Sequence, residues 1–277
     1  MNTNFIVNDY ILIWNLLFGA SISETIYRLK QKIWDTYRKE YNDIFKDKNQ
    51  IIKDYKNFIP NNDTVYNIVI ENKDYEKLRK QVEKYRIDVM QMWDKHKKET
   101  DYLMKNVIRI KIPNYTVFVV NKELGIMDNV SDNQLIMGYE IDKKNPLKFL
   151  ISLNMEIIKS HMKRYKEEYV PFKKAILEFA ILNEYATCVT GRSFYQYGDP
   201  SLQSLKRQLY PYWLMYLGVP KEDFPSFMTR DKIEFNAEKI AYEKELKRMT
   251  IEEFIDFCIR NKRYIVKEQK EEVEEIL

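Results

Sequence analysis

The chain has 277 residues, of which 45% are hydrophobic and 32% are charged, a balance typical of a globular protein with a charged surface. A mean hydropathy of -0.54 excludes an integral membrane protein. The 46 basic and 42 acidic residues are interleaved, unlike the concentrated positive charge of a dedicated nucleic-acid binder. With only 6 glycines and 8 prolines, the chain is short of the turn residues that an all-β fold needs, which favours long helices.

The most apolar stretch is residues 10–22. It is too short to span a bilayer, and the residues before it include Asp9 but no basic residue, unlike the start of a signal peptide. We therefore expect a buried helix, or two short elements, and no association with a membrane.

Helical periodicity dominates most of the first hundred residues. Ser21 and Glu24 have the spacing of a capping box, and the apolar residues behind them predict a helix over about 22–46. Residues 58–63 predict a turn, and 64–71 a short strand. A second helix is expected over 74–104, with one apolar stripe formed by Leu78, Val82, Tyr85, Val89, Met92 and Trp93.

The pattern changes to that of strands near Asn106. Residues 107–112 alternate at period two, 115–120 are rich in β-branched residues, and 134–141 form a third candidate strand. We predict a helix-dominated α+β fold, with a small sheet of three to four strands packed by long helices. We expect an N-terminal helical region, 1–105, and a region of sheet and helical core, 106–277, packed together as one compact unit.

Helix signals return in the second half of the chain. Proline after a capping residue predicts a helix start, glycine predicts a helix end, and a charged tail after Val266 is expected to fray. The expected starts are Asn145-Pro146, Pro171, Asp199-Pro200 and a capping box of Thr250 with Glu253 before a helix over 251–262, and the expected ends are Gly191 and Gly218.

The two cysteines, Cys188 and Cys258, lie far apart and form neither a CxxC pair nor a disulfide framework. They predict two reduced thiols in the core. This cysteine usage is typical of a cytoplasmic protein.

The helix from Pro171 to Thr190 is apolar nearly all the way round, which predicts that it is buried on most sides. Asn183 and Thr187 are one turn apart on it, with Glu184 beside them. A buried carboxylate is costly unless it is paired or hydrogen-bonded. The interpretation we favour is a buried polar cluster, in which Glu184 is paired with Arg192, with Arg207 or with a backbone amide.

Residues 183–187 read Asn-Glu-Tyr-Ala-Thr, which resembles the His-Glu-x-x-His motif of zincin metallopeptidases with both histidines replaced. The order of elements over about 75–217 is also similar to a zincin core: a long helix, then strands, then an apolar helix with the motif. Only Glu184 matches the three defining positions, and asparagine and threonine are poor zinc ligands. His96 and His161 offer no i, i+4 ligand pair. The resemblance thus implies a zincin-like core with a degenerate motif that binds no metal and no cofactor.

The segment 205–216 is the richest in aromatic residues. Pro211 within it is expected to kink or break a helix. Arg207 and Tyr210 are candidate binding residues, because basic residues beside aromatic rings can bind single-stranded nucleic acid. Asn183 and Thr187 are the other two candidate binding residues. We favour core packing for this segment, through Leu202, Leu205, Leu209, Trp213 and Tyr216.

Three functions remain open. The favoured one is a non-catalytic scaffold that binds another protein or itself. The second is a hydrolase-type enzyme with Glu184 as general acid or base, in a pocket lined by Tyr185, Tyr210 and Tyr212. The third is weak nucleic-acid association through basic helix faces. An open cleft at Glu184 would favour the enzyme, and a sealed, fully paired carboxylate would exclude it.

Overall fold

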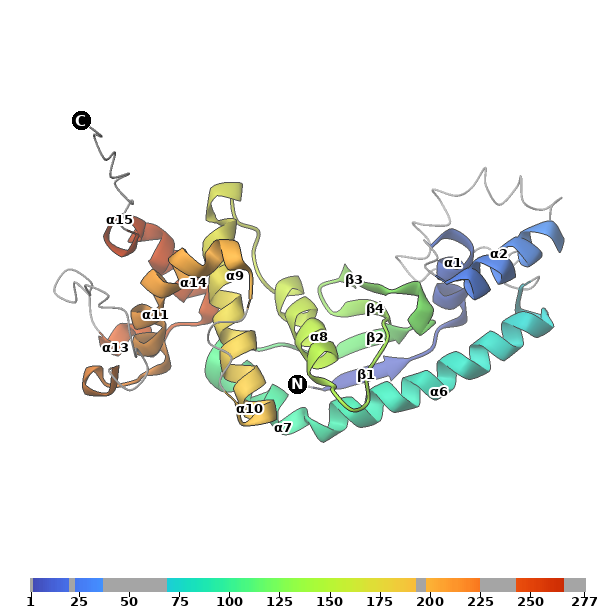
Figure 1. Ribbon diagram of the computed structural model, residues 1–277, viewed down its shortest axis with the longest axis horizontal. Coiled ribbons are helices and arrows are strands. Elements are labelled where there is room, and N and C mark those ends of the chain that lie inside the picture. Colours follow the sequence, from blue (N-terminus) through green and yellow to red (C-terminus); the bar gives the residue numbers. More distant parts are fainter. Residues whose placement is uncertain (1, 20–22, 37–68, 193–197, 225–242, 267–277) are drawn as a thin grey trace, which may run out of the picture. The chain divides into compact units, whose positions relative to one another are not determined.

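A computed structural model describes residues 2–19, 23–36, 69–192, 198–224 and 243–266 (Figure 1). Contacts divide the chain into two compact units, the first formed by 1–98 and 112–161 and the second by 99–111 and 162–277. This division differs from the expected boundary near residue 105, because the sheet stays with the N-terminal helices. The cause is the parallel pairing of the N-terminal strand with residues 115–118.

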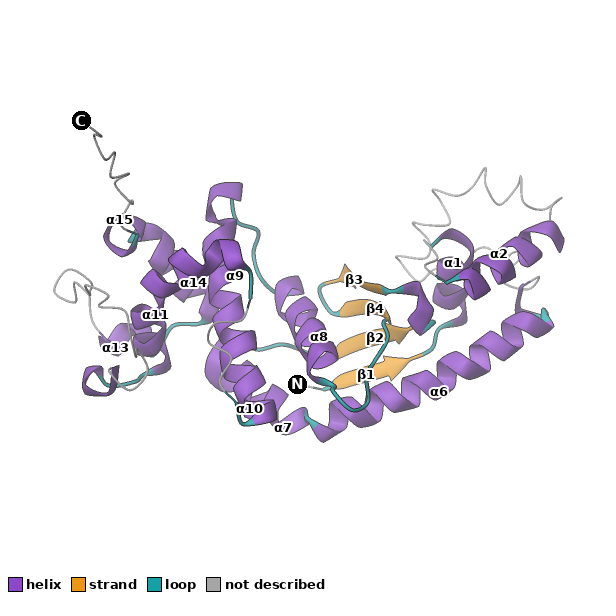
Figure 2. Ribbon diagram, viewed as in Figure 1, coloured by secondary structure: helices purple, strands orange, loops and turns teal. Residues whose placement is uncertain are grey.

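The first unit contains the four strands found among the described residues, which form one sheet in the order β1-β2-β4-β3 (Figure 2). Strands β1, β2 and β4 are parallel, and β3 pairs antiparallel with β4 and is an edge strand. The elements of this unit are β1 (Thr3–Ile6), α1 (Asp9–Phe18), α2 (Glu24–Thr36), α6 (Lys73–Lys95), β2 (Tyr115–Val119), β3 (Ile126–Ser131), β4 (Gln134–Gly138) and α8 (Leu147–Ser160).

Both faces of the sheet are covered. Val117 pairs with Leu135 in the parallel ladder, and Phe118 with Ile136 on the opposite face, and all four side chains are buried. Helix α8 covers the face of Tyr115, whose hydroxyl donates to Asn129 Oδ1 at 2.7 Å, while Asn129 Nδ2 donates to the α8 backbone. These facts confirm the α+β class and the strands near 115–120 and 134–141.

The second unit is helical among its described residues. It contains two π-helices, Leu103–Ile108 and Phe179–Tyr185, which pack against each other. The other helices are the end of α7 (Lys97–Tyr102), α9 (Val170–Glu178), α10 (Ala186–Thr190), α11 (Gln203–Leu217), α13 (Glu243–Leu246), α14 (Ile251–Arg260) and α15 (Lys262–Ile265).

Stacked aromatic rings form the centre of the second unit. Trp213 lies between Phe179 and Tyr216, with ring centroids 5.6 and 5.0 Å away, and Phe254 lies 4.6 Å from Tyr216. The expected core positions of α11 are confirmed, except that Leu205 is only half-buried. Pro211 is buried inside α11 and does not break it. The dense aromatic packing offsets the one hydrogen bond that proline removes.

The predicted strand over 107–112 is wrong. Residues 107 and 108 end a π-helix, and Arg109 stops it with a left-handed backbone, φ 57°. A short apolar run cannot be assigned to strand or helix by periodicity alone, and here both Val107 and Ile108 are buried by helix packing. The expected Asn145 cap is also absent, since α8 begins after Pro146 with no side-chain cap.

Several other boundaries were predicted correctly. Thr250 and Glu253 form the expected capping box, and Gly191 and Gly218 end their helices in the left-handed conformation. The stripe of α6 is buried, apart from the half-buried Met92. Strands β1 and β3 were missed: β1 has four residues, and β3 contains Asp128 and Asn129, which are rare in strands.

Some expectations fall on residues that the structure does not describe. The capping serine Ser21, the part of the first helix after Thr36, the turn over 58–63 and the tail after 266 lie outside the described residues, as do 64–68 of the expected strand. Of the strand's remaining residues, Val69 and Ile70 are helical and Glu71 lies in a turn, so no strand forms there.

Candidate functional site

Residues 183–187, the segment compared above with the zincin motif, lie where the apolar helix changes from π-helical back to α-helical. Asn183 and Glu184 belong to the π-helix, whereas Thr187 belongs to α10. The sheet lies in the first unit and the motif in the second, and α8 stands between β4 and the motif in sequence. π-Helical turns are rare and are often found at functional sites, so the backbone of this segment, as well as its residues, makes it a candidate site.

Glu184 is half-buried, and its Oε1 accepts a hydrogen bond from Trp213 Nε1 at 3.1 Å. The expected partners Arg192 and Arg207 are replaced by this indole, because Arg207 lies on the exposed side of α11. Burial raises the pKa of the Glu184 carboxyl, and the hydrogen bond from Trp213 opposes that rise only in part. The carboxylate is thus neither openly solvated nor fully paired.

The neighbourhood of Glu184 is acidic. Burial is the largest cause that raises the pKa of the Cys188 thiol, and the negative charges of Glu184 and Glu99 raise this pKa further. Cys188 is exposed, which corrects its expected place in the core, whereas Cys258 is buried as expected. The physical reason is that Cys188 lies on the outer side of the short helix α10, close to its end at Gly191.

The other candidate residues do not converge on one cleft. Asn183 is buried, and its Oδ1 has no hydrogen-bond partner among the described residues. Thr187 is half-buried and Arg207 is exposed. The rings of Tyr185, Tyr210 and Tyr212 are enclosed in the core, where the hydroxyl of Tyr185 lies 3.2 Å from Thr100 Oγ1.

The described residues contain no group of three His, Cys, Asp or Glu side chains placed to hold a metal ion. His96 and His161 both follow the last residue of a helix in the first unit. The His161 ring is held by the Ile157 carbonyl at 2.9 Å and by Asn133 Oδ1 at 3.0 Å. These contacts give His161 a structural role at the end of α8.

We expect the raised pKa of Glu184 to weaken the fold at neutral pH. The folded state disfavours the charged carboxylate, so this cost is absent below the ordinary value of 4.5 and grows as the pH rises through the folded pKa. Glu184→Gln, which keeps an acceptor for Trp213, should therefore raise the melting temperature near neutral pH and leave it unchanged in acid. Glu222→Gln, an exposed change in the same unit, is the control. A lower melting temperature for Glu184→Gln at neutral pH would contradict this assignment.

Sequence reasoning missed a buried ion pair in the second unit. Lys206 Nζ lies 3.1 Å from Glu178 Oε2, and both side chains are more than nine-tenths buried, at 6% and 8% exposure. Glu178 Oε1 also accepts from the backbone N–H of Asp199 at 3.0 Å. One sequence signal existed: each charged residue lies on an otherwise apolar helix face.

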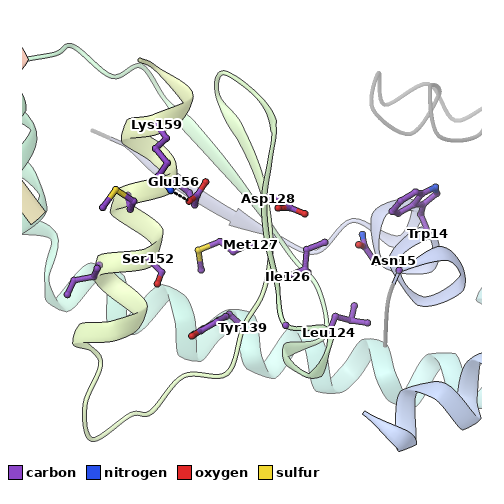
Figure 3. A pocket seen from close by; sticks show the side chains of 14 residues that line it. Trp14, Asn15, Leu124, Ile126, Met127, Asp128, Tyr139, Ser152, Glu156 and Lys159 are labelled. Atoms are coloured by element: carbon purple, nitrogen blue, oxygen red, sulfur yellow. Dashed lines mark hydrogen bonds and ion pairs between the residues drawn. The ribbon is translucent and has the colours of Figure 1, made fainter. Parts of the chain in front are cut away.

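A recess of about 790 Å³ in the first unit was also missed (Figure 3). Its walls are α8 and α1, and β3 lies between them. Met127 points toward α8, whereas Ile126 and Asp128 point toward α1 (Figure 3). Successive side chains of a strand point to opposite faces of the sheet. A recess that is lined by three consecutive residues of β3 is therefore open on both faces of the sheet, at the edge that β3 forms. Its lining also includes Trp14, Asn15, Gly19, Leu124, Gly125, Tyr139, Ile151, Ser152, Met155, Glu156 and Lys159.

A second recess of about 1020 Å³ adjoins the first, since Gly125 and Tyr139 line both. Lys148 lies in it with its Nζ 5.6 Å from the centroid of the Tyr139 ring. We call the two recesses together the β3 trough. It was not predictable from a local pattern, because its walls come from segments more than a hundred residues apart.

No family model, no curated protein and no solved structure matches this chain. Within the described part of the chain, every helix is too short or too polar to cross a membrane. The function must therefore be argued from the geometry of the molecule itself.

Proposed function

We propose that the protein is a non-catalytic binding protein, whose first unit holds an extended segment of a partner polypeptide along β3. The observation that carries this proposal is the lining of the first recess by three consecutive residues of an edge strand. An edge strand presents unpaired N–H and C=O groups, and an extended peptide can pair with them as an added strand.

The dimensions and lining of the trough support a chain-like ligand. Two recesses of about 790 and 1020 Å³ adjoin at Gly125 and Tyr139 and can each receive part of a chain, whereas a compact small molecule needs one enclosed pocket. Met127, Met155 and Ile151 provide apolar surface on the side of α8. Methionine side chains adapt to ligands of varied shape, as in promiscuous peptide-binding surfaces.

Two further elements of the proposal rest on the sequence. The zincin-like character of the core would be that of a degenerate relative, in which Asn183 and Thr187 stand where zinc ligands would be. A cytoplasmic location is proposed from the cysteines, which are both free. The alternative partner in this binding hypothesis is a second copy of the chain.

The first test uses Met155→Lys, which places a charge in the recess at a half-buried position. Peptides are first selected from a random displayed library on the full-length protein, and their affinities are measured by calorimetry. We expect Met155→Lys to weaken binding at least about tenfold, or about 1.4 kcal/mol. The reason is that removing water from the lysine cation, when an apolar side chain of the peptide packs against it, costs free energy. Met92→Lys is the matched control, since Met92 is a half-buried methionine of α6 outside both recesses.

Hydrogen exchange tests the mode of binding in the same complexes. Addition of a strand should protect backbone amides of β3 from exchange, because those that face away from β4 gain a carbonyl partner. Peptides that bind without protecting residues 126–131, or that tolerate Met155→Lys, would overturn the proposal.

One observation favours a second candidate function, catalysis by Glu184. Burial raises the pKa of this carboxyl, and a raised carboxyl pKa is typical of a general acid. Hydrolysis of an unfolded protein such as casein that is lost in Glu184→Gln and kept in Glu222→Gln would establish it. Equal behaviour of the two variants would leave Glu184 with the structural role that we favour.

A further inference from the structure

The charges of the β3 trough are not balanced. Glu156 Oε1 pairs with Lys159 at 2.8 Å and Glu140 Oε1 with Lys122 at 3.7 Å. Lys143 pairs at 2.7 Å with Asp88, which lies outside the trough. The remaining charged side chains of the lining are Asp128, Glu123, Asp142 and Lys148.

Three of these four side chains are carboxylates without a cation. Asp128, Glu123 and Asp142 form no ion pair with any other described residue, and Lys148 contacts the ring of Tyr139 rather than a carboxylate. The lining of the trough therefore holds five carboxylates and four lysines, an excess of one negative charge in a chain whose net charge is +4. A local field opposite in sign to the net charge points to a cationic ligand.

The two sides of β3 differ in chemistry. Met127 faces α8, where Ile151 and Met155 add apolar surface, and Asp128 faces the side of α1 (Figure 3). A strand added beside β3 would alternate in the same way, one side chain toward α8 and the next toward α1. Opposite charges on directly paired residues of neighbouring strands stabilise the pairing, whereas like charges weaken it.

We propose that the partner segment is basic, with lysine or arginine alternating with apolar residues, so that a cation meets Asp128 while an apolar side chain enters beside Met127. The inference rests on the proposed function and adds the class of partner. In the second recess three lysines balance three carboxylates, so the basic preference is expected at the position that meets Asp128 in the first recess. The same carboxylates repel nucleic acid from this surface.

A second copy of this chain fits the trough less well. Two β3 strands paired about a twofold axis that passes near Asp128 would bring the two Asp128 carboxylates to adjacent positions, and this repulsion opposes edge-to-edge pairing in that register. The recess is bounded by α8 on one side and by α1 on the other, so an incoming strand must fit between these two helices (Figure 3). An extended segment of a partner protein, one that is not part of that protein's own folded domain, avoids this repulsion and can fit between the two helices.

Charge reversal tests this inference. A random displayed peptide library is selected in parallel on the full-length protein, on Asp128→Lys and on Asp94→Lys, where Asp94 is an exposed α6 residue outside both recesses. We expect the native protein and Asp94→Lys to enrich peptides with Lys or Arg alternating with aliphatic residues. Asp128→Lys should instead enrich Asp or Glu at one of those positions. A native-selected peptide should bind Asp128→Lys at least about tenfold more weakly, and its Lys→Glu version should recover affinity.

The outcomes separate the two proposals. Peptides that show no basic preference, or keep it on Asp128→Lys, while remaining sensitive to Met155→Lys, would overturn the basic partner and leave strand addition intact. Failure to enrich any peptide would overturn both. Sedimentation of the native protein checks for a second copy, and a dimer that Met155→Lys dissociates would place that copy in the trough and overturn the inference.

Discussion

Replacing Lys206 by methionine should lower the free energy of unfolding of the second unit by about 3–5 kcal/mol, because it leaves the Glu178 carboxylate buried without its cation. The carboxylate would keep the hydrogen bond from the Asp199 N–H, with Gly198 packed directly against it. Urea unfolding followed by tryptophan fluorescence measures the change, since Trp213 lies in the same unit.

The matched variant is the double substitution of Lys206→Met with Glu178→Leu. Removal of both charges of a buried pair is often nearly neutral, so this protein should unfold at close to the native urea concentration. A large loss in the single variant that the double variant recovers shows that the penalty arises from an unpaired charge. Equal losses in both would show that the packing of Lys206 against Phe179 matters instead.

Arg109→Ala should cost about 3 kcal/mol, because charge-assisted hydrogen bonds to several carbonyls are lost together. The guanidinium of Arg109 donates to the carbonyls of Asn106, Lys247 and Tyr216 at 3.0, 2.8 and 3.0 Å. It also donates to Met249 O at 3.2 Å and lies 4.2 Å from the centroid of the Tyr216 ring. One side chain thus joins the end of a π-helix, the end of α11 and the segment before α14.

Arg109→Lys is the control for charge. A lysine keeps the cation but lacks the planar fork that reaches several carbonyls, so it should recover only a minor part of the lost stability. Thermal unfolding of the three proteins gives the order native, lysine, alanine. Full recovery by lysine would mean that the charge alone, over the Tyr216 ring, supplies the stabilisation.

Local signals in the sequence predicted the elements whose causes are local. The capping box at Thr250 and the left-handed glycines Gly191 and Gly218 involve residues within a few positions of one another. The β-branched run of β2 and the apolar stripe of α6 are likewise local patterns, and the structure buries both faces of the first and one face of the second. The assignments failed where the cause was distant: residues 107–112 alternate like a strand, but packing holds 107 and 108 as the end of a π-helix, and 109–112 follow it as a loop.

The candidate sites divide in the same way. Asn183 and Glu184 could be singled out from the sequence, because polar residues within an apolar helix are recognisable from the sequence alone. In the structure Asn183 is buried and Glu184 is half-buried. The partner of Glu184 could not be foreseen, because Trp213 is 29 residues away and several cations were equally plausible. The pair of Glu178 and Lys206 was missed for the same reason.

By itself, the sequence determined the helix-rich α+β class, most helix ends and the amphipathic faces, because these depend on backbone preferences and on neighbours one turn away. Only the tertiary structure decided that the N-terminal strand joins residues 115–118, that β3 is an edge, and that α1 and α8 flank it as a trough. Chain segments far apart in sequence meet through the sum of many weak contacts, and no single residue encodes that sum. The charge that defines the proposed partner, on Asp128, is visible in the sequence, but its lack of a cation is a property of the fold.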